Sequence, residues 1–175
     1  WAIRRPLVVM TPKSLLRATA ASCSLADLSA GRFETVLDDP ATNGRRAAAR
    51  TLLLCTGKVY YDLVEEAAKL GDDRPPIARI EQLYPFPERE VKELLSRYPS
   101  LTDVAWVQEE PRNMGAWSFI EPRMRTILPA GVTMRYIGRP ERASPAEGYL
   151  SAHKAEQARI VGEALGGKGV VVGKS

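Results

Sequence analysis

Residues 103–117, Asp-Val-Ala-Trp-Val-Gln-Glu-Glu-Pro-Arg-Asn-Met-Gly-Ala-Trp, decide the fold of this chain. The apolar run 104–107 predicts a buried strand, and the polar stretch with Gly115 that follows it predicts a loop leading into a helix. Glu109 and Glu110 are neighbours in an extended segment, so their side chains should point to opposite sides of it. They therefore cannot act together on one substrate atom, and a structural or interfacial role suits them better than catalysis.

The same alternation of strand and helix extends to both sides of this stretch. We predict strands at 51–55, 77–80, 104–107 and 133–137, and helices at 58–70, from Pro87 to Tyr98, after Gly115 and at 148–164. Gly71 should end the first of these helices, and Pro122 should kink or restart the third. Apolar strands alternating with amphipathic helices predict an α/β fold, with three layers and a mostly parallel sheet of about five strands between helices on both faces.

The two ends of the chain are less regular. Residues 7–10 predict a strand that leads into a helix capped by Thr11 and opened by Pro12, and residues 33–37 predict an edge strand. We expect one domain over 1–165, with an irregular excursion at 22–50, and a flexible tail at 166–175. The glycines of the tail do not form a P-loop, because Lys168 stands where that motif needs a glycine and no helix can follow Ser175.

Composition excludes several classes of protein. Lys and Arg total 25 against 21 acidic residues, a net charge of +4, but the two signs alternate and form no basic stripe for nucleic acid. The chain has no apolar run long enough to span a bilayer, so we expect no membrane partner. Cys55 lies in the apolar run 52–55 and predicts a buried thiol. Cys23 is the only other cysteine, so we expect a reducing, cytoplasmic setting. We also expect the chain to be a piece cut from a longer protein.

Candidate catalytic groups are few. His153 shares a helical stripe with Leu150, Gln157, Ile160 and Val161, which favours a structural histidine, and no Cys/His spacing suits zinc. We therefore expect no catalytic residue and no metal ligand in this chain.

Two binding surfaces are predicted. Thr56, Gly57 and Lys58 stand where a strand ends and a helix begins, so an anion is favoured there. Arg79 and Arg89 are placed to complete a phosphate pocket; the alternative is that Gly57 only permits a tight turn and Lys58 is solvated. The second surface is a subunit interface made by Gln108, Glu109, Glu110, Arg112 and Asn113, with Trp117 as a buried anchor. The alternative is that Trp117 simply fills the core.

Several separated motifs, in order, carry a resemblance to a known family. They are residues 10–17, 56–62, 79–87, 103–117, 137–140 and 143–146, with His153, Glu156 and Gln157. Together they resemble the C-terminal domain of the thiamine-diphosphate-dependent, decarboxylating component of 2-oxoglutarate dehydrogenase. Other 2-oxo acid dehydrogenase components share this architecture, and residues 22–50 diverge from the family.

The resemblance implies the third domain of a transketolase-like subunit, which packs on two preceding thiamine-binding domains and helps to form a homodimer. In the family those domains supply thiamine diphosphate, magnesium and the catalytic histidines, and the succinyl group passes to a lipoyl-bearing acyltransferase component. Relatives bind AMP or acetyl-coenzyme A as effectors in this domain. Alone, the chain should be inactive. The location implied is the cytoplasm, or the mitochondrial matrix in a eukaryote. A different class of function is a free-standing module that senses nucleotide or acyl-coenzyme A.

Overall fold

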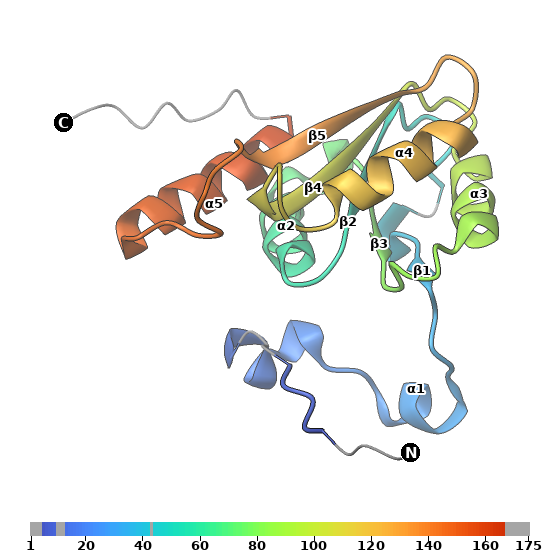
Figure 1. Cartoon of the computed structure of the whole chain (residues 1–175). Coiled ribbons are helices and arrows are strands. Elements are labelled where there is room, and N and C mark those ends of the chain that lie inside the picture. Colours follow the sequence, from blue (N-terminus) through green and yellow to red (C-terminus); the bar gives the residue numbers. More distant parts are fainter. Residues whose placement is uncertain (1–4, 10–12, 43, 167–175) are drawn as a thin grey trace. The chain divides into compact units, whose positions relative to one another are not determined.

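The computed structural model describes residues 5–9, 13–42 and 44–166 (Figure 1). The chain forms two units, residues 1–32 and residues 33–175. The predicted tail lies outside the described residues from position 167 onward.

The first unit consists of short helical segments. Two 3-10 helices, Lys13–Arg17 and Thr19–Ala21, precede α1 (Leu25–Ala30), whose start is capped reciprocally by Ser24 and Asp27. None of these segments contains a buried residue. The strand predicted at 7–10 is wrong for residues 7–9, which have no regular structure, whereas Met10 and the predicted cap at Thr11 and Pro12 lie outside the described residues.

The second unit is built on one sheet. Its strands are β1 (Val36–Leu37), β2 (Thr51–Cys55), β3 (Ile77–Ile80), β4 (Asp103–Pro111) and β5 (Thr133–Arg139). The order is β1-β3-β2-β4-β5; β1 is antiparallel to β3, and the other neighbours are parallel. The predicted mostly parallel sheet of about five strands is confirmed, including the edge strand within 33–37. The strand order reverses between β2 and β4, and in open parallel sheets ligands bind outside the carboxyl ends of the strands at such a point.

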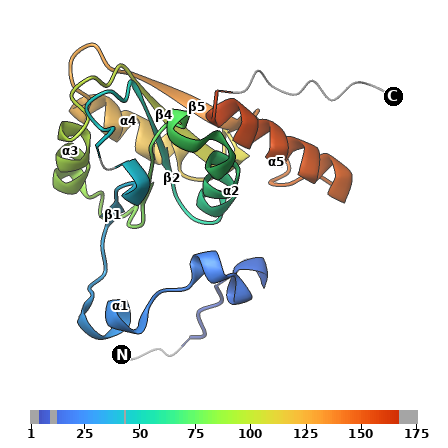
Figure 2. The same cartoon turned by 180° about the vertical axis from the view of Figure 1, so that it is seen from behind.

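Helices cover both faces of the sheet, so the three-layer prediction is confirmed (Figures 1 and 2). The helices α3 (Glu88–Ser96) and α4 (Trp117–Ile127) pack on one face, and α2 (Val59–Ala67) and α5 (Leu150–Ala164) pack on the other. In β2, Leu52 and Leu54 face the first pair of helices, whereas Leu53 and Cys55 face the second. Because both faces are covered, the strand needs an uninterrupted apolar run.

One predicted helix feature is confirmed and one differs from the structure. After α2 ends at Ala67, the 3-10 segment Ala68–Asp73 follows, but Gly71 within it is non-helical, with φ 59° and ψ −130°. The helical run from Val59 therefore ends at Gly71, as predicted, in a conformation that glycine adopts without a steric penalty. Pro122 lies within α4 and does not divide it. The buried thiol is confirmed, since Cys55 is fully buried, and this burial raises its pKa to about 12.

The irregular segment before β2 is held to the sheet by a buried ion pair. Asp39, which is 3% exposed, accepts hydrogen bonds from Arg74 through both carboxylate oxygens, at 2.6 and 2.9 Å. The backbone amides of Ile77 and Ala41 donate to the same carboxylate, at 2.8 and 2.9 Å. Burial works to raise the pKa of Asp39, but the bonds from Arg74 and the two amides outweigh it, so the pKa is lowered.

Replacement of Asp39 by Asn should destabilise the second unit strongly, because Arg74 would keep a buried charge without a counter-charge. We expect a loss of roughly 3–5 kcal/mol in the free energy of unfolding, measured by urea denaturation. Asp72→Asn is the matched control: Asp72 pairs with Arg45 at 3.6 Å but is 94% exposed, so it should change stability by less than about 0.5 kcal/mol. Equal effects of the two substitutions would contradict the assignment.

The Asp39 pair should also make stability depend on pH. Since the folded state lowers the pKa of this carboxyl, the stabilisation is fully present above the pKa of the unfolded state, about 3.9, and is lost as the pH falls through the folded value. Urea midpoints measured from pH 7 to pH 3 should therefore fall less in Asp39→Asn than in the unchanged chain. Parallel pH profiles for the two proteins would argue against this.

Candidate functional site

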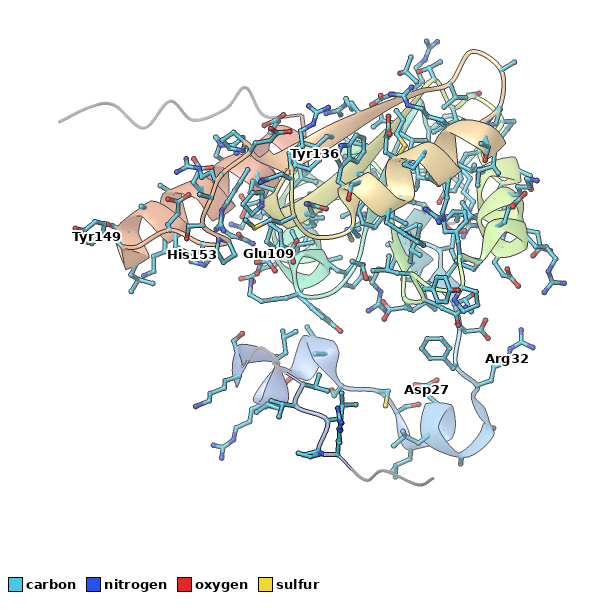
Figure 3. All side chains as sticks on the ribbon, viewed as in Figure 1. Asp27, Arg32, Glu109, Tyr136, Tyr149 and His153 are labelled. Carbon is cyan, nitrogen blue, oxygen red and sulfur yellow. The ribbon has the colours of Figure 1, made fainter. Side chains whose placement is uncertain are left out.

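The carboxyl ends of β2 and β4 carry a closed polar cluster. Nζ of Lys58 lies 2.8 Å from Oδ2 of Asp62 and 3.0 Å from Oε2 of Glu109. Nε2 of Gln157, from α5, donates to the same two oxygens at 2.7 and 3.0 Å. One ammonium and one amide thus bind two carboxylates that come from different elements. Glu109 and the α5 segment that carries His153 lie at the same end of the sheet in Figure 3.

This arrangement changes what Lys58 offers to a ligand. Burial works to lower its pKa, but the bonds to Asp62 and Glu109 outweigh burial and raise the pKa, so Lys58 stays charged with its charge already matched. Gly57 has a positive φ of 72°, which the turn from β2 into α2 requires. An anion that binds at Thr56, Gly57 and Lys58 would therefore have to displace a carboxylate from the ammonium.

The two arginines of the predicted pocket are engaged elsewhere. Arg79 stacks over the Tyr60 ring, 4.2 Å from its centroid, and pairs with Glu81 at 3.3 Å. The Arg89 side chain is 79% exposed at the start of α3 and pairs with Glu90 at 2.8 Å. No hydrogen bond or ion pair described for either arginine reaches Lys58. The phosphate pocket as a whole stays a prediction.

Gln108 is the centre of the loop that follows β4. It is 2% exposed, and its Oε1 accepts from Nε1 of Trp106 at 2.9 Å and from the backbone amide of Trp117 at 3.0 Å. Its Nε2 donates to the carbonyls of Glu110, Pro111 and Met114 at 3.3, 3.1 and 2.8 Å. All the hydrogen-bonding capacity of this amide goes into the domain itself, so Gln108 shapes the loop and offers nothing to a partner.

The remaining interface candidates divide into core and surface. Trp117 is 7% exposed and packs 5.3 Å from the Tyr136 ring, in agreement with the alternative that it fills the core. Glu109 belongs to the Lys58 cluster. Glu110, Arg112 and Asn113 are exposed, so the interface stays a prediction that these three residues carry. Glu109 and Glu110 do point to opposite faces, as expected, because Glu110 lines a cavity beside Phe119 of α4.

His153 has a structural contact. Its Nδ1 lies 3.0 Å from Nη2 of Arg139, which is 3% exposed at the end of β5. Because guanidinium only donates hydrogen bonds, Nδ1 acts as the acceptor in this contact. The sequence did not indicate the partners Asp62, Gln157 and Arg139. Only the spacing of Lys58 and Asp62, four residues apart at the start of a helix, was a signal that could have suggested one of them.

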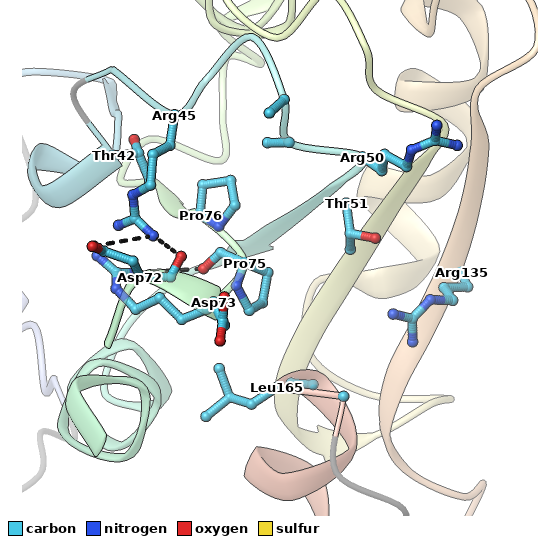
Figure 4. A pocket seen from close by; sticks show the side chains of 15 residues that line it. Thr42, Arg45, Arg50, Thr51, Asp72, Asp73, Pro75, Pro76, Arg135 and Leu165 are labelled. Atoms are coloured by element: carbon cyan, nitrogen blue, oxygen red, sulfur yellow. Dashed lines mark hydrogen bonds and ion pairs between the residues drawn. The ribbon is translucent and has the colours of Figure 1, made fainter. Parts of the chain in front are cut away.

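Two cavities lie at opposite ends of the strands. The first, of about 270 Å³, opens at the carboxyl ends and is lined by Thr56, Leu83, Tyr84, Gln108, Glu110, Gly115, Ala116 and Phe119. The second, of about 460 Å³, lies near the amino end of β2 and is shown in Figure 4. Three of its arginines are matched by carboxylates: Arg45 by Asp72, Arg74 by Asp39 and Arg135 by Asp103. Most of the charge in the larger cavity is therefore neutralised within the chain.

Neither a metal site nor a membrane segment is found in the part of the chain that the structure describes. No group of three or more His, Cys, Asp and Glu side chains there is arranged to hold a metal ion. Among the same residues, every helix is too short or too polar to cross a bilayer.

Replacement of Gly115 by Ala should disturb the loop that Gln108 organises. Gly115 has a φ of +64°, and an added Cβ would lie 2.9 Å from Nε2 of Gln108 and 3.0 Å from Oε2 of Glu110. Gly131→Ala is the control, because Gly131 also has a positive φ, +83°, but an added Cβ there meets nothing within 4 Å. We expect Gly115→Ala to lose roughly 1–3 kcal/mol more than Gly131→Ala in urea denaturation. Equal losses would show that only the backbone conformation matters.

Comparison with known proteins connects this geometry to a family. The family model described as 2-oxoglutarate dehydrogenase C-terminal matches residues 22–165. The chain is 48% identical over 163 residues to the 2-oxoglutarate dehydrogenase E1 components of Shouchella clausii and Bacillus subtilis, and 47% identical over 162 residues to that of Geobacillus kaustophilus. Each match covers 92% of this chain and 17% of the relative, so the chain spans about a sixth of the length of these proteins.

The match includes the β2–α2 turn, the Gln108 loop and α5, the three segments that build the carboxyl edge of the sheet. It confirms the resemblance drawn from the motifs and gives no support to a free-standing sensory module. The chain belongs to the family of 2-oxoglutarate dehydrogenase C-terminal domains.

Proposed function

We propose that this chain works as the non-catalytic C-terminal domain of a thiamine-diphosphate-dependent E1 component. In that enzyme, 2-oxoglutarate is decarboxylated and the succinyl group is passed to a lipoyl group of the acyltransferase component. The observation that carries the proposal is the family match over residues 22–165, joined to a carboxyl edge at which Lys58 is paired with Asp62 and Glu109 of the same domain.

The cofactors belong to the rest of the enzyme in this proposal. Two observations on the described residues support this assignment: no group of three or more His, Cys, Asp and Glu side chains is arranged to hold a metal ion, and Lys58 at the switch point is paired with two carboxylates. We assign thiamine diphosphate and magnesium to the preceding domains. This chain supplies packing surface for them and for the second subunit of a homodimer. The cytoplasmic location stays a prediction.

A chimera tests this function. The C-terminal segment of the Bacillus subtilis relative is replaced by this chain, with which it shares 48% identity over 163 residues. The chimera should form a dimer by analytical ultracentrifugation and should oxidise 2-oxoglutarate with ferricyanide as the electron acceptor. The relative cut before this segment should do neither. The purified chain alone should show no turnover with added thiamine diphosphate and magnesium. A well-folded chimera without activity, or an active isolated chain, would contradict the proposal.

A second role, effector binding at Thr56, Gly57 and Lys58, is favoured by the placement of Lys58 at the topological switch point of the sheet. Binding at this site requires displacement of an existing contact, because an anionic effector has to compete with Asp62 and Glu109 for the ammonium of Lys58. Arg79 or Arg89 would have to leave its present carboxylate to contribute.

Calorimetric titration with acetyl-coenzyme A and with AMP measures this role. Lys58→Ala should weaken binding because it removes the only cation of the cluster. Glu109→Gln should strengthen it by about two- to fivefold, since one competing charge is lost while the side-chain shape is kept. Unchanged affinity in both variants would remove the site from consideration.

A further inference from the structure

The cavity at the carboxyl ends of the strands has an aromatic wall. Tyr84, from the loop after β3, and Phe119, from the first turn of α4, meet edge to face with 6.4 Å between ring centroids. Leu83 and Ala116 complete the apolar lining. Tyr84 is 81% exposed, although large aromatic side chains usually gain by burial. An exposed aromatic ring that packs on a half-buried one, beside a hollow of about 270 Å³, is typical of a point where a partner is anchored.

Glu110 supplies one unmatched charge at this cavity. Its carboxylate lies over Gly115, where an added Cβ would come within 3.0 Å of Oε2. Within residues 5–9, 13–42 and 44–166, no cation pairs with Glu110, whereas its neighbour Glu109 is bound by Lys58 and Gln157. A carboxylate without a partner, set against aromatic rings, is complementary to a cation that also has an apolar or planar surface.

The volume of the cavity and the chemistry of its lining indicate which side chain it can bind. The volume, about 270 Å³, lies at the lower edge of the range of about 300–1,000 Å³ that small-molecule sites occupy, so it suits a single side chain. A guanidinium group satisfies both features of the cavity, because it can bind a carboxylate through two hydrogen bonds and stack on an aromatic face. The domain already uses this contact, because Arg79 lies 4.2 Å from the Tyr60 centroid and Arg123 covers one face of the Phe119 ring, 3.6 Å from its centroid. The exposed ring of Tyr84 therefore offers the main stacking face to a further guanidinium.

We propose that the cavity receives an arginine side chain from the part of the longer enzyme that lies outside this chain. Glu110 belongs to the predicted interface loop. The relatives are about six times longer than the matched segment, so the rest of such an enzyme supplies most of the surface on which this domain can pack. The source of the arginine rests on the proposed function, whereas the preference of the cavity for guanidinium does not.

A titration with a small probe tests the cavity by itself. N-acetyl-arginine amide is added to the purified chain, and binding is followed by NMR through the ring protons of Tyr84 and Phe119. Saturable binding is expected, and it should be at least about fivefold weaker for Glu110→Gln, which loses the charge but keeps the shape, and for Phe119→Leu. Glu121→Gln is the matched control, because Glu121 pairs with Arg125 on α4 outside the cavity and should leave the affinity unchanged.

The uncharged analogue N-acetyl-citrulline amide separates guanidinium recognition from simple apolar binding. It should bind at least about fivefold more weakly than the arginine amide. Equal binding of the two amides, or unchanged affinity in Glu110→Gln, would overturn the inference and leave the proposed function standing. Thermal denaturation of each variant checks that the fold is intact.

A crosslink identifies the source of the side chain. In the chimera with the Bacillus subtilis relative, Tyr84→p-benzoylphenylalanine is irradiated and the crosslinked peptides are sequenced. The crosslink should fall within a few residues of an arginine outside the C-terminal segment, and replacement of that arginine by Gln should abolish it. A crosslink to a peptide without arginine, or none in an active chimera, would overturn the inference. An inactive, well-folded chimera would instead count against the proposed function.

Discussion

The amide of Gln108 is the constraint on which the carboxyl edge of this domain depends. One side chain accepts from the indole of Trp106 and from the first amide of α4, and it donates to three carbonyls of the following loop. Since an unsatisfied amide at 2% exposure would be costly, the loop can take few other shapes. The close approach at Gly115 follows directly, because any Cβ there would collide with this amide.

The fixed loop separates two chemical environments along one strand. Glu109 turns toward α2 and α5, where Lys58 and Gln157 bind it together with Asp62 in a cluster of one positive and two negative charges. Glu110 turns toward α4, beside Tyr84 and Phe119, and has no ion-pair partner among the residues that the structure describes. The carboxylate on one face of the sheet is therefore hydrogen-bonded within the domain, while the carboxylate on the other face is left for the proposed partner.

This division agrees with the role of a domain within a longer enzyme. The family match places the chain in about a sixth of each relative, and the polar cluster of Lys58, Asp62, Glu109 and Gln157 joins elements of the second unit to each other. The buried pair of Asp39 and Arg74 does the same for the irregular segment before β2: it fastens a stretch that has little regular structure to the start of β3.

The sequence by itself determined the α/β class, the parallel strands with their helices, the buried Cys55 and the family, because periodicity and local motifs are properties of short segments. It also predicted that Glu109 and Glu110 point apart. It did not predict that residues 7–9 lack a strand, since an apolar run becomes a strand only where a neighbouring strand pairs with it. Only the tertiary structure decided the partners of Lys58, His153 and Asp39. These partners are Glu109, Arg139 and Arg74, which lie 51, 14 and 35 positions away along the chain. Lys58 also pairs with Asp62, which lies on the next helical turn. Such contacts depend on how the strands are ordered, and no local pattern in the chain records that order.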